Sequence, residues 1–118
     1  MVCPQPLSSR IALERALERF DIPAHYMTEL EQRIRLETSF NLDEFSPVPW
    51  ARNVHVPTLL YQVKDDVYTR PSDVQATFDN IPAEKDLFWI EGTTKRWDGY
   101  AYFQREPARI LDWFARYM

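Results

Sequence analysis

Glycine is the residue that this sequence most lacks. Only Gly92 and Gly99 occur among 118 residues, whereas the average frequency of about 7% would give about eight. A G-x-G-x-x-G dinucleotide fingerprint and a P-loop each require glycines at fixed spacings that this chain does not contain. The sequence therefore excludes a nucleotide site built on a glycine-rich loop.

Cysteine and histidine are also scarce. The one cysteine, Cys3, has no second cysteine with which to form a disulfide, and its spacing from His25 and His55 does not resemble a zinc site. We therefore expect no metal, no cofactor and a reducing, cytoplasmic environment. Cys3 is interpreted as a small buried residue rather than as a nucleophile. The two histidines are interpreted as surface or packing residues rather than as ligands.

The chain has neither a surplus of basic residues nor a long apolar run. Its 14 basic and 18 acidic residues are mixed along the sequence and give a net charge of −4, so we expect no nucleic-acid partner. No apolar stretch approaches the roughly 20 residues that cross a bilayer, and we expect no membrane partner and a soluble protein. With 45% hydrophobic residues the chain can form a core, and its length predicts a single domain over residues 1–118.

Hydrophobic periodicity predicts an α/β fold. Apolar runs without alternation predict strands buried on both faces, and so a parallel sheet, near 56–63 and 86–91, with a further strand near 1–4. Amphipathic and capped segments predict helices near 9–20, 25–37, 72–80 and 106–117. The strand, helix and strand in the second half form a βαβ unit. Residues 41–57 and 91–103 are predicted to be irregular.

The second predicted helix carries a capping signal and several acidic residues. Thr28 and Glu31 have the T-x-x-E spacing of a capping box. Glu29, Glu31 and Glu37 are interpreted as a solvated helix face.

Two carboxylates, Asp65 and Asp66, follow directly after the strand near 56–63. Ligands of open parallel sheets bind beyond the carboxyl ends of the strands, so these residues lie where a site would be. The alternative is that they cap a loop and solvate a strand end, and the sequence leaves both interpretations open. The predicted loop over 91–103 contains four aromatic residues, Trp97, Tyr100, Tyr102 and Phe103. They could line a pocket, but we favour a role in anchoring the last helix.

Residues 54–118 resemble the C-terminal part of an α/β-hydrolase, in particular of the dienelactone-hydrolase-like branch. The resemblance rests on VHVPTLLYQVKDDVYTRPSDVQATFDNIPAEKDLFWIEG and on PARILDWFARYM. In that family the penultimate strand reads hPhLhhhGxxDxhhP, and its aspartate is the acid of a Ser-Asp-His triad. Asp66 falls on that position, although Val63 replaces the usual glycine and Pro71 comes one residue late. The resemblance also implies that residues 11–53 form the variable region over the active site, and that a ligand would be a small ester or lactone.

The other parts of a hydrolase site are missing from this sequence. The nucleophile elbow of the family reads G-x-S-x-G, and no serine here has the glycines for it. Lys95 stands where the family has its histidine, and an amine with an ordinary pKa of about 10.4 is protonated at neutral pH. We therefore expect a hydrolase-like fragment that begins at Met1 and contains about the last three strands of the fold. In this fragment Asp66 occupies the triad-acid position, and we expect no hydrolytic activity from the chain alone. The alternative is a non-enzymatic oligomerising or binding module built on the same half-fold.

Both alternatives leave a sheet edge whose backbone groups lack a partner strand. Such edges pair readily with other chains. The sequence therefore predicts a homo-oligomer, with a symmetric dimer that covers this edge.

Overall fold

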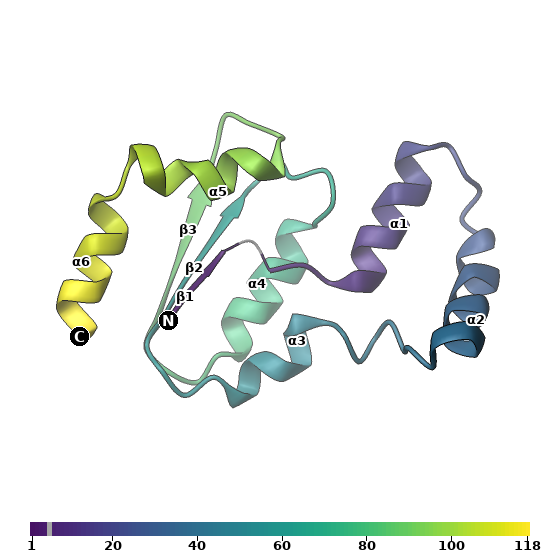
Figure 1. Ribbon diagram of the computed structural model, residues 1–118, viewed down its shortest axis with the longest axis horizontal. Coiled ribbons are helices and arrows are strands. Elements are labelled where there is room, and N and C mark those ends of the chain that lie inside the picture. The colour runs from purple at the N-terminus through teal and green to yellow at the C-terminus, as the bar shows by residue number, and fades with distance from the viewer. Residues whose placement is uncertain (5) are drawn as a thin grey trace.

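A computed structural model of the chain describes residues 1–4 and 6–118. In this part of the chain three strands form one parallel sheet, with β2 between β1 and β3 (Figure 1). The strands are β1 (Val2–Pro4), β2 (Thr58–Val63) and β3 (Lys85–Ile90). The predicted α/β fold, with parallel strands near 1–4, 56–63 and 86–91, is confirmed. Gln5, in the segment predicted to follow the first strand, lies outside the described residues.

Four helices correspond to those predicted from periodicity. They are α1 (Ser9–Arg19), α2 (Tyr26–Thr38), α4 (Pro71–Asn80) and α6 (Ala108–Tyr117). Helix α4 connects β2 to β3 and completes the predicted βαβ unit. Among the described residues, no helix has the length and apolar character needed to cross a bilayer.

The segment after β3 contains a helix, so the prediction of an irregular chain over 91–103 is wrong. Helix α5 spans Arg96–Arg105 and has Asp98 in its first turn, where a carboxylate interacts favourably with the helix dipole. Gly99 lies inside this helix and lowers its intrinsic propensity by about 1 kcal/mol relative to alanine. The packing of Phe103 against Tyr61 of the sheet, with ring centroids 4.4 Å apart, outweighs that low propensity.

Residues 41–57, predicted to be irregular, also include helical turns. A short helix, α3 (Pro47–Trp50), continues into a 3₁₀ turn, η1 (Ala51–Asn53). The Ser46 hydroxyl accepts a hydrogen bond from the Val48 N–H at 3.3 Å, and Pro47 occupies the first helical position. Serine followed by proline is a recognised start signal for a helix, so this element had a local signal in the sequence.

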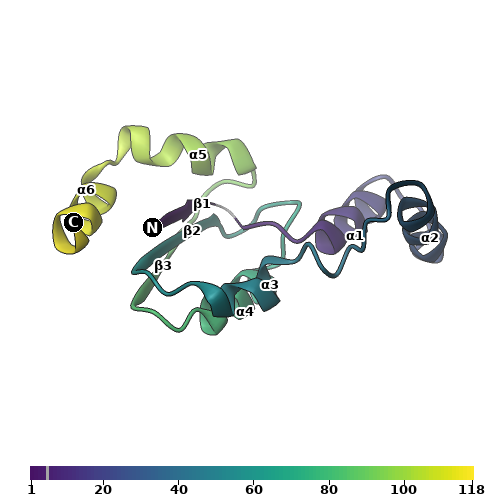
Figure 2. The same cartoon turned by 60° about the horizontal axis from the view of Figure 1, so that its bottom comes forward.

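Helices cover both faces of the sheet (Figure 2). On one face Tyr61 and Val63 of β2 pack with Ile90 of β3 and Phe103 of α5. On the other face Leu60 packs with residues of η1 and of the end of α4. Neighbouring residues of a strand point to opposite faces. Because both faces of β2 are covered, all six of its residues are buried, as its largely apolar sequence without alternation predicted.

Strand β3 is less buried than its sequence indicated. Five of its six residues are only half-buried, and Ile90 alone is buried. The strand pairs with β2 on one side and lies at the edge of the three-stranded sheet. An apolar run of this kind predicts a strand but does not distinguish a central strand from an edge strand.

The first residue of β3 also closes the preceding helix. The Lys85 ammonium group donates hydrogen bonds to the backbone carbonyls of Phe78, Asp79 and Ile81, at 2.8 to 2.9 Å. The last carbonyls of a helix have no partner within the helix, and a cation there also interacts favourably with the helix dipole. Lys85 therefore supplies the C-terminal cap of α4.

Helices α1 and α2 form an arm that projects from the sheet (Figure 1). We call residues 9–38 the arm, and β1 together with residues 42–118 the body. Neither helix of the arm contains a buried residue. The Cα radius of gyration is 16.0 Å, whereas a compact chain of this length has about 13.5 Å. The arm thus makes the molecule longer than a compact domain.

The start of α2 differs from the predicted capping box. The helix begins at Tyr26 with His25 as its N-cap residue, so Thr28 lies inside the first turn. Glu31 accepts a hydrogen bond from Arg10 of α1 at 2.6 Å. The predicted solvated face is therefore wrong for Glu31, whose carboxylate holds the two arm helices together, while Glu29 and Glu37 are exposed.

Candidate functional site

The two carboxylates after β2 have opposite environments. Asp65 is exposed, whereas Asp66 is 1% exposed. The turn that separates them from the strand is closed by the Asp66 N–H, which donates to the Val63 carbonyl at 3.3 Å. Of the two interpretations that the sequence left open, solvation of a strand end fits Asp65 only.

Both carboxylate oxygens of Asp66 accept hydrogen bonds. Oδ1 accepts from the Tyr68 N–H at 2.9 Å, and Oδ2 accepts from Gln62 Nε2 at 3.0 Å and from Arg96 Nη1 at 2.7 Å. The Gln62 amide also donates to the Thr69 hydroxyl at 3.1 Å. A buried carboxylate is tolerated when it is paired and fully hydrogen-bonded. Asp66 thereby joins the end of β2, the following loop and the start of α5.

The cation that pairs with Asp66 is Arg96 rather than the neighbouring lysine. The Arg96 side chain is 14% exposed and the Asp66 side chain is fully buried. Lys95, the residue in the histidine position of the resemblance, is exposed and is the N-cap residue of α5. The first turn of α5 directs the next side chain, that of Arg96, to Asp66. Sequence reasoning missed Arg96 because it did not predict this helix.

Neither histidine of the chain contacts Asp66. His55 is exposed and precedes β2, at the opposite end of the strand from Asp66. His25 is exposed at the start of α2, with its ring 4.3 Å from that of Tyr26. The interpretation of both as surface residues is confirmed.

Cys3 lies in β1 and packs against the cluster that contains Leu60. Burial raises the pKa of its thiol, which reduces the fraction of reactive thiolate at neutral pH. This environment agrees with a packing role rather than a nucleophilic one.

The four aromatic residues predicted to lie in a loop are on α5 and separate into two pairs. Phe103 is buried, and the Tyr102 ring lies 5.2 Å from that of Phe88. Trp97 is 78% exposed, and its ring lies 5.6 Å from that of Tyr100. The first pair anchors α5 on the sheet, and Ile110 of α6 packs against the same apolar cluster, so the predicted role in anchoring the last helix is confirmed for Tyr102 and Phe103. The second pair is at the surface.

An open groove of about 530 Å³ lies at the carboxyl edge of the sheet. Its walls come from α1, from the loop after β2, and from the segment between β3 and α5. We call it the basic groove, and its lining residues are Arg15, Glu18, Arg19, Val67, Tyr68, Thr94, Lys95 and Arg96. This is the edge at which open parallel sheets bind their ligands.

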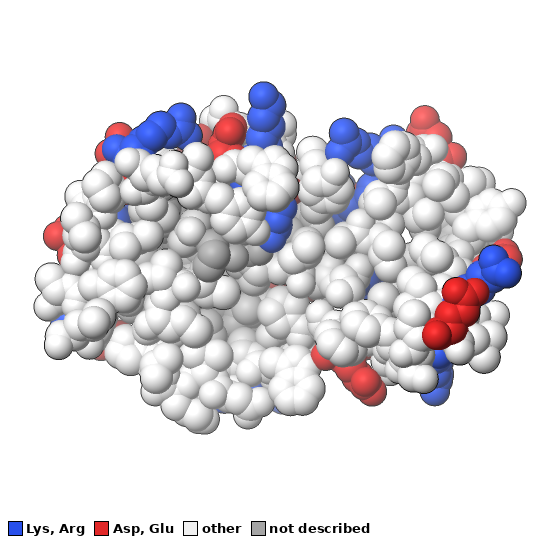
Figure 3. Space-filling model, viewed as in Figure 1, with Lys and Arg blue, Asp and Glu red and all other residues white. Residues whose placement is uncertain are grey.

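Positive charge dominates the basic groove, although the whole chain has a net charge of −4. Four cationic side chains line it against one carboxylate, Glu18, and one of the four, Arg96, is paired with the buried Asp66 behind the groove wall. That carboxylate is itself paired with Arg15 and with Arg70, each at 3.1 Å. Figure 3 shows Lys and Arg atoms on both sides of the notch between the arm and the body. The groove therefore has the electrostatics of a site for an anion.

Two arginines of the groove are also oriented by neutral acceptors. Arg15 Nε donates to the Val67 carbonyl at 3.1 Å, and Arg19 Nη1 donates to the Tyr68 hydroxyl at 2.9 Å. Arg15 and Arg96 have carboxylate partners in Glu18 and Asp66, so Arg19 and Lys95 are the groove cations that form no ion pair with another described residue. Within the described residues, no group of three or more His, Cys, Asp or Glu side chains could hold a metal ion.

Comparison of the chain with family models, with curated proteins and with solved structures gave no match. The resemblance to α/β-hydrolases therefore stays a prediction from the residues, and the function has to be argued from the geometry.

Proposed function

We propose that this chain is a non-hydrolytic binding module related to the α/β-hydrolases, and that its basic groove binds a small organic anion. The observation that carries the proposal is the pairing of Asp66 with Arg96 at 2.7 Å. A triad acid acts by accepting the N–H of a histidine and stabilising the imidazolium. The same oxygen here accepts from a guanidinium and an amide, so the triad-acid position has a structural role.

The groove beside this pair supports the ligand class. The Lys95 ammonium is exposed, while Arg15 and Arg19 lie on the opposite wall. Ammonium and guanidinium groups bind carboxylate and phosphate through charge-assisted hydrogen bonds. Val67 and the Tyr68 ring offer apolar surface for the remainder of such a molecule. A carboxylate or a phosphate carried on a small apolar body matches these features.

The absence of hydrolysis is tested with p-nitrophenyl acetate. We expect the purified chain to release nitrophenol no faster than buffer alone. Turnover above background that stays constant per milligram through two different chromatographic steps would contradict the non-hydrolytic half of the proposal.

Ligand binding is tested by titrating the ¹⁵N-labelled chain with benzoate and with phenyl phosphate, which distinguish the two anions, and with neutral benzyl alcohol. We expect amide shifts around residues 67–68 and 94–96 for an anion and none for the alcohol. Loss of one exposed charge contact of about 1 kcal/mol predicts a Kd about fivefold higher for Lys95→Gln.

The matched control is Lys64→Gln. Lys64 is an exposed lysine outside the groove and pairs with Glu91 at 2.6 Å. We expect the Lys64→Gln variant to bind the anion with the same Kd as the wild type. Equal weakening by both substitutions, or shifts produced equally by benzyl alcohol, would overturn the anion site.

A further inference from the structure

Helix α2 carries an exposed stripe along its length. Tyr26, Glu29, Arg33 and Leu36 occur at i, i+3, i+7 and i+10, a spacing that places them on one helix face. All four are exposed, Tyr26 by 47% and Leu36 by 85%. The half-buried residues of α2, such as Leu30 and Ile34, lie beside this stripe on the adjoining part of the helix surface.

The accessible surface of the chain leaves room for a partner on this stripe. The chain exposes 7648 Å², whereas a compact monomer of its mass exposes about 6,700 Å². The difference, about 900 Å², is close to the roughly 800 Å² that each partner buries in a standard protein interface. This excess is a property of the whole chain, and α1 and α2, which contain no buried residue, contribute to it.

The order of residues along the stripe is self-complementary. If a second α2 lies antiparallel and is related by a two-fold axis at the level of residue 31, Tyr26 faces Leu36 of the second copy. In the same register Glu29 faces Arg33 of the second copy. Each apolar residue then meets an apolar residue and each charge its opposite, twice per dimer, as an isologous interface requires. Within its own helix Arg33 has only a weak partner, Glu37, at 4.0 Å.

The edges of the sheet are less suited to pairing. Strand β1 has three residues, and β3 carries the charged side chains of Lys85 and Asp86. Short strands and charged side chains are the features by which edge strands avoid pairing with other chains. The arm is therefore the better surface for the self-association that the sequence predicted.

We propose that two copies of this chain associate through their α2 stripes, antiparallel and about a two-fold axis, independently of any ligand in the basic groove. The exposed side chains of Tyr26 and Leu36 become buried against each other, and the Glu29 and Arg33 side chains form two pairs across the axis.

The test is a charge swap read out by sedimentation equilibrium at micromolar concentrations. We expect the wild type to form a dimer. Arg33→Glu places two pairs of like charges across the axis, and Glu29→Arg does the same with the opposite sign. Like charges facing each other in an interface cost several kcal/mol, so each variant should dimerise at least about tenfold more weakly.

Two further samples make the test specific to this register. The double variant E29R/R33E restores opposite charges at every pair and should dimerise as the wild type does. An equimolar mixture of the two single variants should form a heterodimer, because the charges of one complement those of the other. The matched control, Arg52→Glu, changes an exposed arginine of the body and should leave the dimer unchanged.

Several outcomes would overturn the proposal. A wild-type monomer across the micromolar range would show that the stripe is not a self-association surface. A dimer that resists Arg33→Glu would place the interface elsewhere, for example on the sheet edge. Failure of both the double variant and the mixture to restore the dimer would exclude the antiparallel register, provided that circular dichroism shows each variant to be folded.

Discussion

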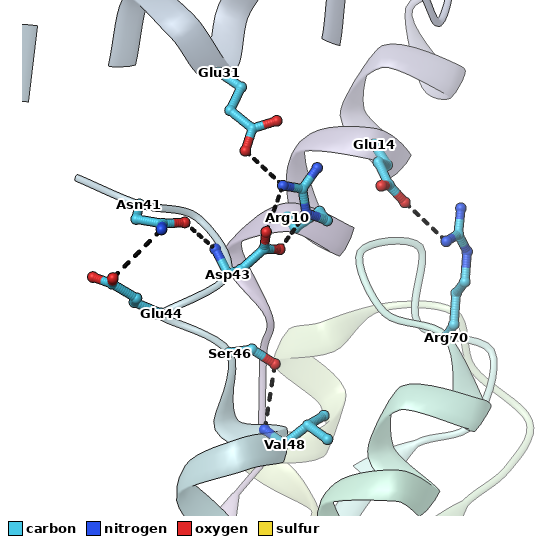
Figure 4. Close-up of polar contacts among 9 residues, drawn as sticks. All are labelled: Arg10, Glu14, Glu31, Asn41, Asp43, Glu44, Ser46, Val48 and Arg70. Carbon is cyan, nitrogen blue, oxygen red and sulfur yellow. Dashed lines mark hydrogen bonds and ion pairs between the residues drawn. The ribbon is translucent and has the colours of Figure 1, made fainter. Parts of the chain in front are cut away.

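All six residues of β2 are buried, whereas α1 and α2, which together have four times as many residues, contain no buried residue. The body closes around two apolar clusters, one on each face of the sheet. The arm is attached through charged side chains. Arg70 of the body pairs with Glu14 of α1 at 2.9 Å, and Arg10 of α1 pairs with Asp43, which follows the arm (Figure 4).

The body and the arm respond to different conditions. Apolar burial stabilises by about 25 cal/mol per Å² and is insensitive to moderate salt. Exposed ion pairs contribute about 0 to 1 kcal/mol each and are screened by salt. The body is therefore expected to unfold as a cooperative core, while the position of the arm depends on pH and ionic strength.

The largest effect is expected from a cavity in the body. Leu60 is 1% exposed, and truncation of a buried leucine to alanine costs about 2 to 5 kcal/mol. Leu60→Ala should lower the free energy of unfolding, measured by urea denaturation, by that amount. Leu111→Ala is the control, because Leu111 is 61% exposed and its loss should cost less than about 0.5 kcal/mol. Similar losses for the two variants would mean that the apolar clusters do not dominate the stability of the body.

An intermediate effect is expected from the ion pair at the carboxyl edge of the sheet. Asp66→Asn leaves the Arg96 guanidinium in a largely buried position without its counter-charge. Breaking a fully buried pair costs about 3 to 5 kcal/mol, and the partial exposure of Arg96 reduces our expectation to about 2 kcal/mol. Urea unfolding followed by circular dichroism measures the loss.

Asp65→Asn is the matched control for that substitution. Asp65 is the exposed neighbour in the same turn, and its replacement should change the free energy of unfolding by less than about 0.5 kcal/mol. If the two asparagine variants were equally stable, Asp66 would not hold the structural role that we assign to it.

The smallest effect is expected in the arm and depends on pH. The Arg10 guanidinium hydrogen-bonded to Asp43 lowers the pKa of that carboxyl. A lowered native pKa means that the stabilisation is fully present above the ordinary value of about 3.9 and is lost as pH falls through the native pKa. The arm amides should therefore lose protection from hydrogen exchange below about pH 4, while the β2 amides keep theirs.

The contribution of this pair should be less than about 1 kcal/mol, because the Asp43 side chain is 66% exposed. Asp43→Asn should reduce the pH dependence of the arm, to which the pairs of Arg70 with Glu14 and Glu18 also contribute, and should leave the body unaffected. An arm whose acid-induced opening persists unchanged in that variant would show that another carboxylate holds it.

The sequence predicted those parts of the fold whose signals are local. The largely apolar run of β2 and the periodicity of α1 and α2 each depend on neighbouring residues, and all three elements are found. Helix α5 has weak periodicity and an internal glycine, and it is stabilised by the packing of Phe103 on the sheet, which is a contact distant in sequence.

The candidate site also has one part with a local signal in the sequence and one part that depends on distant contacts. Asp66 was identified because it follows a strand at a fixed spacing. Its partner Arg96 lies 30 positions further along the chain and reaches it only because α5 begins at that residue. The basic groove depends in addition on the placement of α1 beside two loops, which no local pattern in the sequence encodes.

Lys85 has a consequence for the way in which the body opens. It is the first residue of β3, and its ammonium group holds the final carbonyls of α4. Glu84 directly precedes Lys85, and its backbone carbonyl accepts a hydrogen bond from the N–H of Thr58, the first residue of β2. The end of α4 and the starts of both strands therefore share one junction. We expect them to open as one cooperative unit, so that amides in the last turn of α4 exchange at the rate of the central strand rather than at the faster rate of a fraying helix end.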